Sequence, residues 1–288
     1  MICQTIGKTE AKDCSFSEIC AIFVGKEKKH NAMRKMMLMM VAAIMCVAAT
    51  AQERYEKCEL IVGGDTLRYC ALAPQQIEQG KSYPLVVFLH GAGERGEDNQ
   101  AQLLHGSQQF LNPVNREKYP CYAIFPQCPS GKYGAYINRP LSLVPSEMTI
   151  QEQPSAFVSQ VHQLITKYLA EQHVDSRRVY VIGLSMGAMA TYDMVIRYPE
   201  LFAAAVPICG TVNPERITEA VKHTKWSIYH GDADTTVPLD GSREAYRKLR
   251  AVGAEVKYTE FPGVAHGSWN PAFSQPDFMK WLFAQIRQ

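Results

Sequence analysis

The residues with the clearest chemical potential surround one serine. The pentapeptide Gly183–Gly187 (GLSMG) follows the apolar run at 179–182 and precedes a segment with helical spacing of apolar residues. A G-x-S-x-G turn between a strand and a helix is typical of a nucleophile elbow, whose glycines leave room for a sharp, strained turn. Such a turn raises the Ser185 hydroxyl above the sheet and points the N–H of Met186 at a developing oxyanion. We therefore predict Ser185 as nucleophile and Met186 as one oxyanion donor.

A serine hydroxyl needs a base, and two histidines beyond the elbow lie in suitable loops. His266 follows the last predicted strand in the glycine-containing turn 261–269. The glycines let the chain swing an imidazole back toward the elbow. His230 ends the preceding strand and is expected to hydrogen-bond its own loop. His266 is therefore the predicted base.

The acid should lie between serine and histidine along the chain, because that is the order in folds with this elbow. Asp232 and Asp234 both follow the strand that ends at His230. Asp234 lies four residues beyond the strand, where its loop can reach His266. Asp232 is expected to order the turn instead. Asp234 is the predicted acid.

A second oxyanion donor is expected in the loop after the strand at 85–89. That loop, 90–96, reads HGAGERG, and its small residues let backbone N–H groups approach a substrate. We predict the N–H of Ala92 as donor and Gly93 as a substrate-binding neighbour. Trp269 lies near the base in the sequence, and either walls the substrate pocket or packs beside the last helix. Paired metal-ligand spacings are lacking, so neither a metal nor another cofactor is expected.

The segments that must position these residues alternate between strand-like and helix-like patterns. The predicted strands are 85–89, 121–125, 179–182, 203–208, 226–229 and 255–261, and the predicted helices are 154–171, 186–198, 242–252 and 276–286. This alternation predicts an α/β fold with a mainly parallel central sheet. Two short runs around Gly63-Gly64-Asp65 predict an N-terminal β-hairpin. The stretch 126–154 is rich in Pro, Gly and Tyr, and its length indicates a functional or mobile loop, such as a lid.

The first 51 residues differ from the rest. Arg34 and Lys35 precede an uncharged apolar run at 36–51 that ends in Ala-Thr-Ala. This pattern is typical of a secretory signal peptide. An anchor helix is the alternative, although the run is shorter than the ~20 residues of a membrane span. We predict an upstream extension without structure at 1–32, a signal peptide at 33–51 and one catalytic domain at 52–288, exported to the periplasm or the exterior without stable membrane insertion.

Removing this leader changes the charge and the cysteine count. The 288 residues include 30 Lys and Arg, 28 Asp and Glu, and carry a net charge of +2. Residues 52–288 keep 23 basic and 24 acidic side chains, so the net charge is about −1 and a nucleic-acid partner is not expected. Five cysteines remain, at Cys58, Cys70, Cys121, Cys128 and Cys209. Cys58 and Cys70, on the two hairpin arms, either face each other or stay unpaired.

Several strings in the chain together resemble the α/β-hydrolase superfamily. They are PLVVFLHGAGERGEDN, PQCP, VYVIGLSMGAMATYD, RYPELFAAAVPICG, HGDADTTVP and KYTEFPGVAHGSWNPAF. More narrowly, the sequence resembles exported bacterial esterases of the predicted-peptidase or phospholipase/carboxylesterase type, relatives of feruloyl esterases and polyhydroxybutyrate depolymerases. The resemblance covers nearly all of 55–288. It implies an α/β-hydrolase fold with helices on both faces of the sheet, and Ser185, Asp234 and His266 as the catalytic triad. One departure is Ala188, where many relatives carry a second glycine.

The resemblance also implies a function. It implies a secreted serine hydrolase that cleaves carboxylic esters through an acyl-enzyme, with feruloyl or acetyl esters of plant polysaccharides as substrates. A serine peptidase of the prolyl-oligopeptidase type is one alternative, disfavoured because the chain lacks a propeller domain. A non-catalytic binding protein on a hydrolase scaffold is another, disfavoured because all three triad positions are filled.

Overall fold

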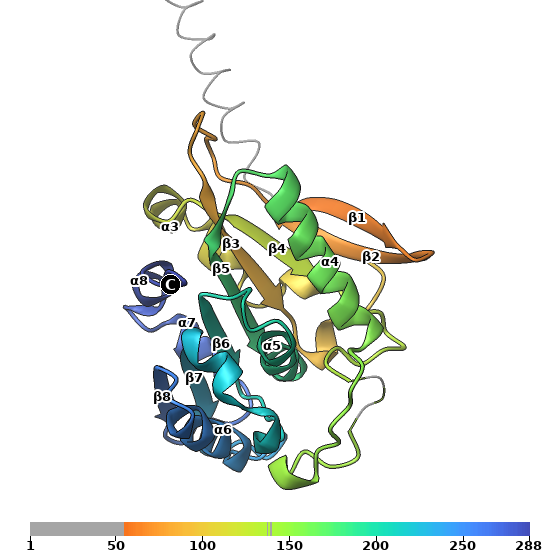
Figure 1. Cartoon of the computed structure of the whole chain (residues 1–288), viewed down its shortest axis with the longest axis vertical. Helices are drawn as coiled ribbons and strands as arrows, with labels where there is room; N and C mark the ends of the chain where they lie inside the picture. The colour runs from red at the N-terminus through yellow and green to blue at the C-terminus, as the bar shows by residue number, and fades with distance from the viewer. Residues whose placement is uncertain (1–54, 137, 139) are drawn as a thin grey trace, which may run out of the picture. The chain divides into compact units, whose positions relative to one another are not determined.

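One sheet of eight strands organises the part of the chain that the computed structural model describes, residues 55–136, 138 and 140–288 (Figure 1). The strands are β1 (Glu56–Val62), β2 (Asp65–Leu72), β3 (Tyr83–Leu89), β4 (Tyr122–Pro126), β5 (Val174–Leu184), β6 (Ala204–Ile208), β7 (Lys225–Gly231) and β8 (Val256–Phe261). Their order in space is β1-β2-β4-β3-β5-β6-β7-β8. β2 pairs antiparallel with β1 and β4, and the other neighbours pair parallel. The predictions of a mainly parallel sheet and an N-terminal hairpin are confirmed.

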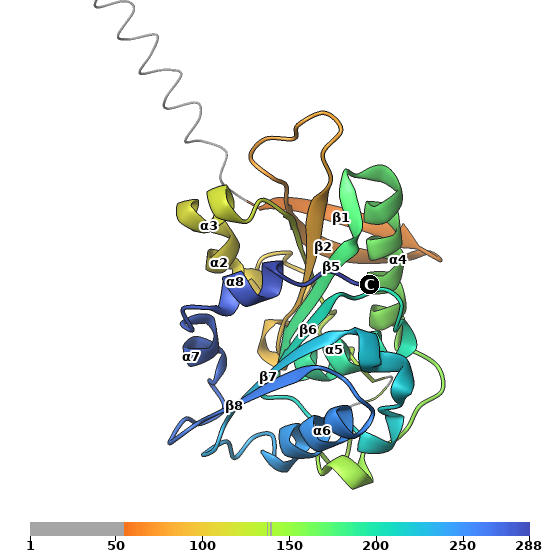
Figure 2. The ribbon, with the colours of Figure 1, turned by 60° about the vertical axis from the view of Figure 1, so that its left-hand side comes forward.

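Helices cover both faces of this sheet. They are α2 (Ser107–Leu111), α3 (Pro113–Lys118), α4 (Ala156–Glu171), α5 (Met186–Arg197), α6 (Asp240–Ala251), α7 (Trp269–Phe273) and α8 (Phe278–Phe283). α4, α5 and α6 pack on one face, and α2, α7 and α8 pack on the other (Figure 2). β3 shows why, because Leu85, Val87 and Leu89 enter one apolar cluster while Val86 and Phe88 enter the other. Among the described residues, every helix is too short or too polar to cross a membrane.

Some elements differ from their predicted extent. β5 begins at Val174, five residues before the predicted strand, because its first half carries exposed polar side chains that give no apolar signal. The helix predicted at 276–286 is the shorter α8, and α7, which precedes it, was not predicted. Pro276 lies between them and cannot continue the hydrogen bonding of α7. The predicted extension and signal peptide at 1–51 lie outside the described residues.

The hairpin register decides between the two alternatives for its cysteines. Cys58 lies opposite Tyr69, and Cys70 lies opposite Lys57. Successive side chains of a strand point to opposite faces, so the two thiols lie on different sides of the sheet. All five cysteines of the described residues are unpaired. The alternative of two unpaired hairpin cysteines is therefore confirmed.

The first turn of α5 lies directly against the end of β3. A Cβ atom added at Gly187 would lie 1.9 Å from the carbonyl oxygen of Leu89 and 2.6 Å from that of His90. A Cβ atom at Gly183 would lie 2.1 Å from the carbonyl oxygen of Gly187. Because these neighbours are backbone atoms that cannot move aside cheaply, only glycine allows the helix to begin here.

His90 joins the end of β3 to the chain that follows β4. Its Nε2 accepts a hydrogen bond from the N–H of Cys128 at 2.9 Å, and its Nδ1 lies 2.6 Å from the carbonyl oxygen of Gly91. These partners require a neutral imidazole with its proton on Nδ1. Burial lowers the pKa of His90 to about 4. His90 is 2% exposed, so protonation would place a charge in the core and abolish the bond from Cys128.

We predict that Gly187→Ala destabilises the fold. A methyl group at this backbone contact should lower the free energy of unfolding by about 1–3 kcal/mol or more, as overpacking does elsewhere. Denaturant unfolding of the purified variant measures the loss. Gly131→Ala is the matched control, because a Cβ atom there would meet nothing within 4 Å. Equal stability of the two variants would contradict the prediction.

We also predict that His90 makes stability fall in mild acid. In the unfolded chain this histidine titrates near ~6.5, so the unfolded state binds more protons than the native state between about pH 6.5 and about pH 4. Its contribution is complete above that window and is lost as the pH falls through it, by up to about 3 kcal/mol. Urea unfolding at several pH values measures the slope. His90→Gln should flatten it, and an unchanged slope in that variant would show that other groups cause it.

Candidate active site

Ser185, His266 and Asp234 form one continuous hydrogen-bonded line. His266 Nε2 lies 2.9 Å from Ser185 Oγ, and His266 Nδ1 lies 2.7 Å from Asp234 Oδ2. Ser185 directly follows β5, while Asp234 and His266 lie in the loops after β7 and β8. Parallel strands end at the same edge of a sheet, so residues 81 positions apart in the chain meet there.

The partners fix the direction of this line. Asp234 carries only acceptors when ionised, so the proton of His266 is assigned to Nδ1. Nε2 is then free to accept the hydroxyl proton of Ser185. The geometry therefore suits the transfer of that proton from Ser185 to His266, with the imidazolium stabilised by Asp234.

Four donors surround the carboxylate of Asp234. Besides His266, they are His230 Nε2 at 3.1 Å, the N–H of Thr236 at 2.8 Å and the N–H of Val237 at 3.0 Å. Burial by itself raises the pKa of this carboxyl group, but the hydrogen bonds from the two histidines and the two N–H groups outweigh it and hold the pKa well below its usual range. Asp234 is therefore ionised in the folded protein at neutral pH.

His230 has a second contact that the sequence did not indicate. As expected, it bonds its own loop, with Nε2 3.2 Å from the carbonyl oxygen of Val237. The same nitrogen shares Asp234 Oδ2 with His266, and Nδ1 lies 2.7 Å from Ser242 Oγ on α6. His230 therefore holds the Asp234 carboxylate in place while it is itself held by Ser242. The four-residue spacing from His230 to Asp234 was the available signal. Asp232 was expected to order its own turn, but its Oδ1 instead accepts from the N–H of Gly263 in the loop after β8, at 2.6 Å.

Ser185 has the backbone conformation of a strained turn. Its φ is 53°, one of three positive values at non-glycine positions among the described residues. Such a conformation costs roughly 1–3 kcal/mol and persists only where the surroundings impose it. Here the N–H of Ser185 donates to the carbonyl oxygen of Ile208 at 2.9 Å. Met186 is the first residue of α5, so its N–H has no acceptor within the helix and is available to a substrate oxygen.

The loop of the second predicted donor lies against the elbow. Ala92 begins the short 3-10 turn Ala92–Glu94. A Cβ atom added at the preceding Gly91 would lie 2.8 Å from the Leu184 side chain, just before the nucleophile. A Cβ atom at Gly93 would meet nothing within 4 Å, so this position faces open space. The structure therefore brings the loop of Ala92 and the start of α5 together beside Ser185.

Trp269 lies beside the predicted base. Its ring is nearly perpendicular to that of His266, at 86° and 5.6 Å between centroids, and it also contacts His105 at 4.9 Å. It is partly exposed and begins α7, so it has features of both alternatives, the pocket wall and the packed aromatic. His105 was not among the predicted site residues.

One cluster of potential metal ligands occurs among the described residues. Ligand atoms of Cys209, Asp234 and His266 lie within 4.8 Å of one another. Two of these residues form the hydrogen-bonded line itself. A cation there would replace the proton between His266 and Asp234, so metal binding and proton transfer along this line exclude each other.

Comparison with known proteins places the chain in a family. The Phospholipase/Carboxylesterase family matches residues 75–277. The "Probable carboxylesterase Os04g0669600" of Oryza sativa subsp. japonica is 24% identical over 199 residues, which cover 64% of this chain and 81% of the rice protein. Acetylxylan esterase A of Aspergillus ficuum is 30% identical over 128 residues, covering 33% of this chain and 42% of that enzyme.

A solved structure of a thermostable esterase has the same fold. It superposes with a TM-score of 0.74 at 33% identity, over 82% of this chain and 64% of that one. The expectations of an α/β-hydrolase fold and of a carboxylic-ester hydrolase are thereby confirmed. Because the family match spans well over half of the residues, the chain belongs to the phospholipase/carboxylesterase family.

Proposed function

We propose that the protein is an exported serine esterase that hydrolyses carboxylic esters through an acyl-enzyme. The observation that carries this proposal is the line from Ser185 through His266 to Asp234, in a chain of the carboxylesterase family. The line joins a nucleophile, a base and an ionised acid in the order that ester hydrolysis requires.

In the first half of the reaction, Ser185 Oγ attacks the ester carbonyl carbon while His266 Nε2 takes the hydroxyl proton. The carbonyl oxygen becomes an oxyanion, which the N–H groups of Ala92 and Met186 hold. One such donor contributes about 10²–10³ in rate. The C–O bond then breaks, and the alcohol leaves with the proton from His266.

In the second half, His266 takes a proton from water, and the resulting hydroxide attacks the acyl carbon. The same two N–H groups hold the second oxyanion. Collapse of this intermediate releases the carboxylic acid, and the proton returns to Ser185 Oγ. Asp234 stays ionised throughout and keeps the imidazole in the required tautomer.

We propose acetyl or feruloyl esters of plant polysaccharides as substrates. The similarity to an acetylxylan esterase supports the acetyl group. The feruloyl group rests on the resemblance of the sequence motifs to feruloyl esterases. We propose that Trp269 lines the side from which the alcohol leaves, because its ring contacts that of His266, which delivers the proton to that oxygen.

A serine-directed fluorophosphonate probe and an ester assay test the triad. The probe should label the wild type and leave Ser185→Ala unlabelled. Asp234→Asn should lower kcat by about 10⁴, because an amide imposes the wrong histidine tautomer. Asp232→Asn is the matched control, since Asp232 contacts Gly263 and neither histidine, and it should keep nearly full activity. Equal losses in the two variants, or labelling of Ser185→Ala, would refute the assignment.

The same preparation separates esterase from peptidase. The wild type should turn over p-nitrophenyl acetate and methyl ferulate far faster than peptide p-nitroanilides. Faster turnover of the amides would overturn the proposed ester specificity and favour a peptidase with the same three residues. Failure of the probe to label the wild type would instead favour the alternative of a non-catalytic binding protein on a hydrolase scaffold.

The proposal of export rests on the pattern at 33–51. A basic pair, a short apolar run and a small-residue end resemble a cleavable signal. Expression of the full chain in a Gram-negative host and N-terminal sequencing of the periplasmic or secreted protein should give a mature chain that begins at or near Gln52. A protein retained in the cytoplasm with its leader intact would contradict export.

A further inference from the structure

The chain between β4 and α4, of which the structure describes residues 127–136, 138 and 140–155, contacts the loop of Ala92 at its first end. We call this stretch the β4–α4 segment. The N–H of Gly96 donates to the carbonyl oxygen of Cys128 at 3.0 Å, and Arg95 Nη1 donates to that of Lys132 at 2.9 Å. The loop that carries Ala92 is therefore bound to this segment by backbone and side-chain contacts.

The same segment also contacts the start of α5. The N–H of Gly134 lies 3.3 Å from the sulfur of Met186, and the hydroxyl of Tyr133 lies 3.7 Å from the sulfur of Met189. Gly134, Met186 and Tyr133 are all buried. Residues 127–134 thus touch both elements that carry the proposed oxyanion donors.

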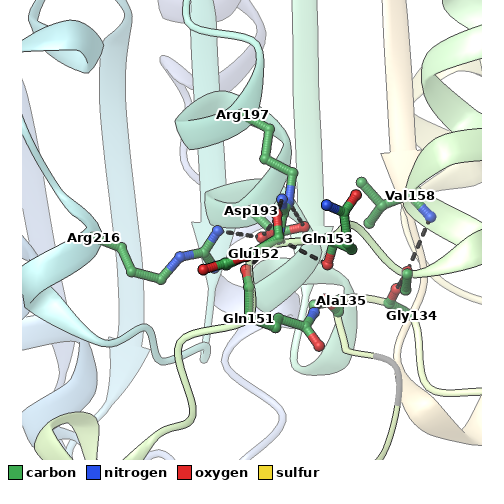
Figure 3. Close-up of polar contacts among 10 residues, drawn as sticks. Gly134, Ala135, Gln151, Glu152, Gln153, Val158, Asp193, Arg197 and Arg216 are labelled. Carbon is green, nitrogen blue, oxygen red and sulfur yellow. Dashed lines mark hydrogen bonds and ion pairs between the residues drawn. The ribbon is translucent and has the colours of Figure 1, made fainter.

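A buried ion cluster of two α5 residues and Arg216, which lies in the 3-10 turn Pro214–Arg216, contacts the other end of the segment (Figure 3). Asp193 accepts from Arg197 Nε, at 3.0 and 2.9 Å to its two oxygens, and from Arg216 Nη2. The side chains of Asp193, Arg216 and Arg197 are 1%, 6% and 12% exposed. Burying charges in this way requires that their hydrogen-bonding groups find partners.

Arg197 uses its remaining N–H groups on the segment. Nη2 donates to the carbonyl oxygens of Gln151 at 2.8 Å and Gln153 at 3.1 Å, and Nη1 donates to that of Glu152. One guanidinium therefore holds three consecutive peptide groups while Asp193 holds the guanidinium. A lysine ammonium lacks the planar fork that makes this possible.

Two hydrogen bonds within the segment connect the part that Arg197 binds to Gly134 and Ala135 (Figure 3). Gln151 Nε2 donates to the carbonyl oxygen of Ala135 at 2.8 Å. The hydroxyl of Ser155 donates to the carbonyl oxygen of Gly134 and also caps α4. Hydrogen bonds and short stretches of the chain therefore connect Asp193 to Met186 through Arg197, the segment and Gly134.

We propose that Asp193 and Arg197 are positioning residues for the oxyanion hole. They fix the β4–α4 segment as a strap across the loop of Ala92 and the start of α5, and so set the distance between the two donor N–H groups. This inference rests on the proposed esterase function. A displacement of about 1 Å at such a site costs up to about 10² in rate, so the anchor matters although its charges lie outside the reacting centre.

Asp193→Asn and Arg197→Lys test the proposal in the full enzyme. Asparagine keeps the shape and loses the charge, while lysine keeps the charge and loses the fork. In both variants kcat for p-nitrophenyl acetate should fall about 10- to 100-fold with KM changed by less than about threefold. Affinity for a boronic acid, whose tetrahedral adduct on Ser185 places an oxygen in the oxyanion hole, should fall by the same factor as kcat/KM. Circular dichroism at the assay temperature identifies the variants that remain folded.

Arg178→Lys is the matched control. Arg178 also joins an aspartate, Asp175 at 2.9 Å, to a backbone carbonyl, that of Ser82 at 3.2 Å, but it lies in the first half of β5, away from Ser185. Its kcat and boronic acid affinity should match the wild type.

Folded Asp193→Asn and Arg197→Lys variants with wild-type kcat and boronic acid affinity would overturn the positioning role. If Asp193→Asn does not fold, Arg197→Lys and Gln151→Ala decide by the same two readouts. A wild type that the fluorophosphonate probe does not label would overturn the proposed function instead, so the two failures are distinguishable.

Discussion

The contact between Gly187 and the end of β3 is the constraint on which the rest of the site depends. Because two backbones meet there without a side chain between them, α5 begins immediately after β5 and the chain has no room for a relaxed turn. Ser185 must take a positive φ, and Met186 must present its N–H at the edge of the sheet. The same contact brings the loop after β3 beside the nucleophile, so one packing constraint places two of the proposed catalytic components.

The position and charge of the Asp234 carboxylate depend on hydrogen bonds rather than on backbone packing. The side chain of Asp234 is buried, yet it stays ionised because four donors converge on it, and two of these are histidines, one at the end of β7 and one in the loop after β8. The carboxylate is therefore rigid before any substrate arrives. A pre-arranged acceptor of this kind avoids reorganisation during the reaction, which is where fixed dipoles are more effective than water.

The sequence predicts well what depends on local chemistry. The elbow glycines, the loops that carry Asp234 and His266, the hairpin and the buried strands each have a signature within a few residues. The Asp193 cluster has none, because Arg197 binds peptide groups 44 to 46 positions away, and a carbonyl oxygen carries no residue type. For the same reason the sequence predicted only a functional or mobile loop, such as a lid, where the β4–α4 segment lies. It also did not reveal that two histidines share Asp234. The first half of β5 was missed because its exposed polar residues depend on neighbouring strands rather than on an apolar pattern.

If the protein is exported as proposed, the unpaired cysteines affect the lifetime of its folded state in an oxidising compartment. Burial raises the pKa of Cys70 to about 11 and those of Cys121, Cys128 and Cys209 to about 12, so these thiols stay protonated and unreactive while the sheet is intact. Unfolding would release them together, and in an oxidising medium they could pair with one another before the chain refolds. The lifetime of the active protein would then depend on how rarely it opens rather than on its equilibrium stability, and each opening would carry a risk of permanent loss.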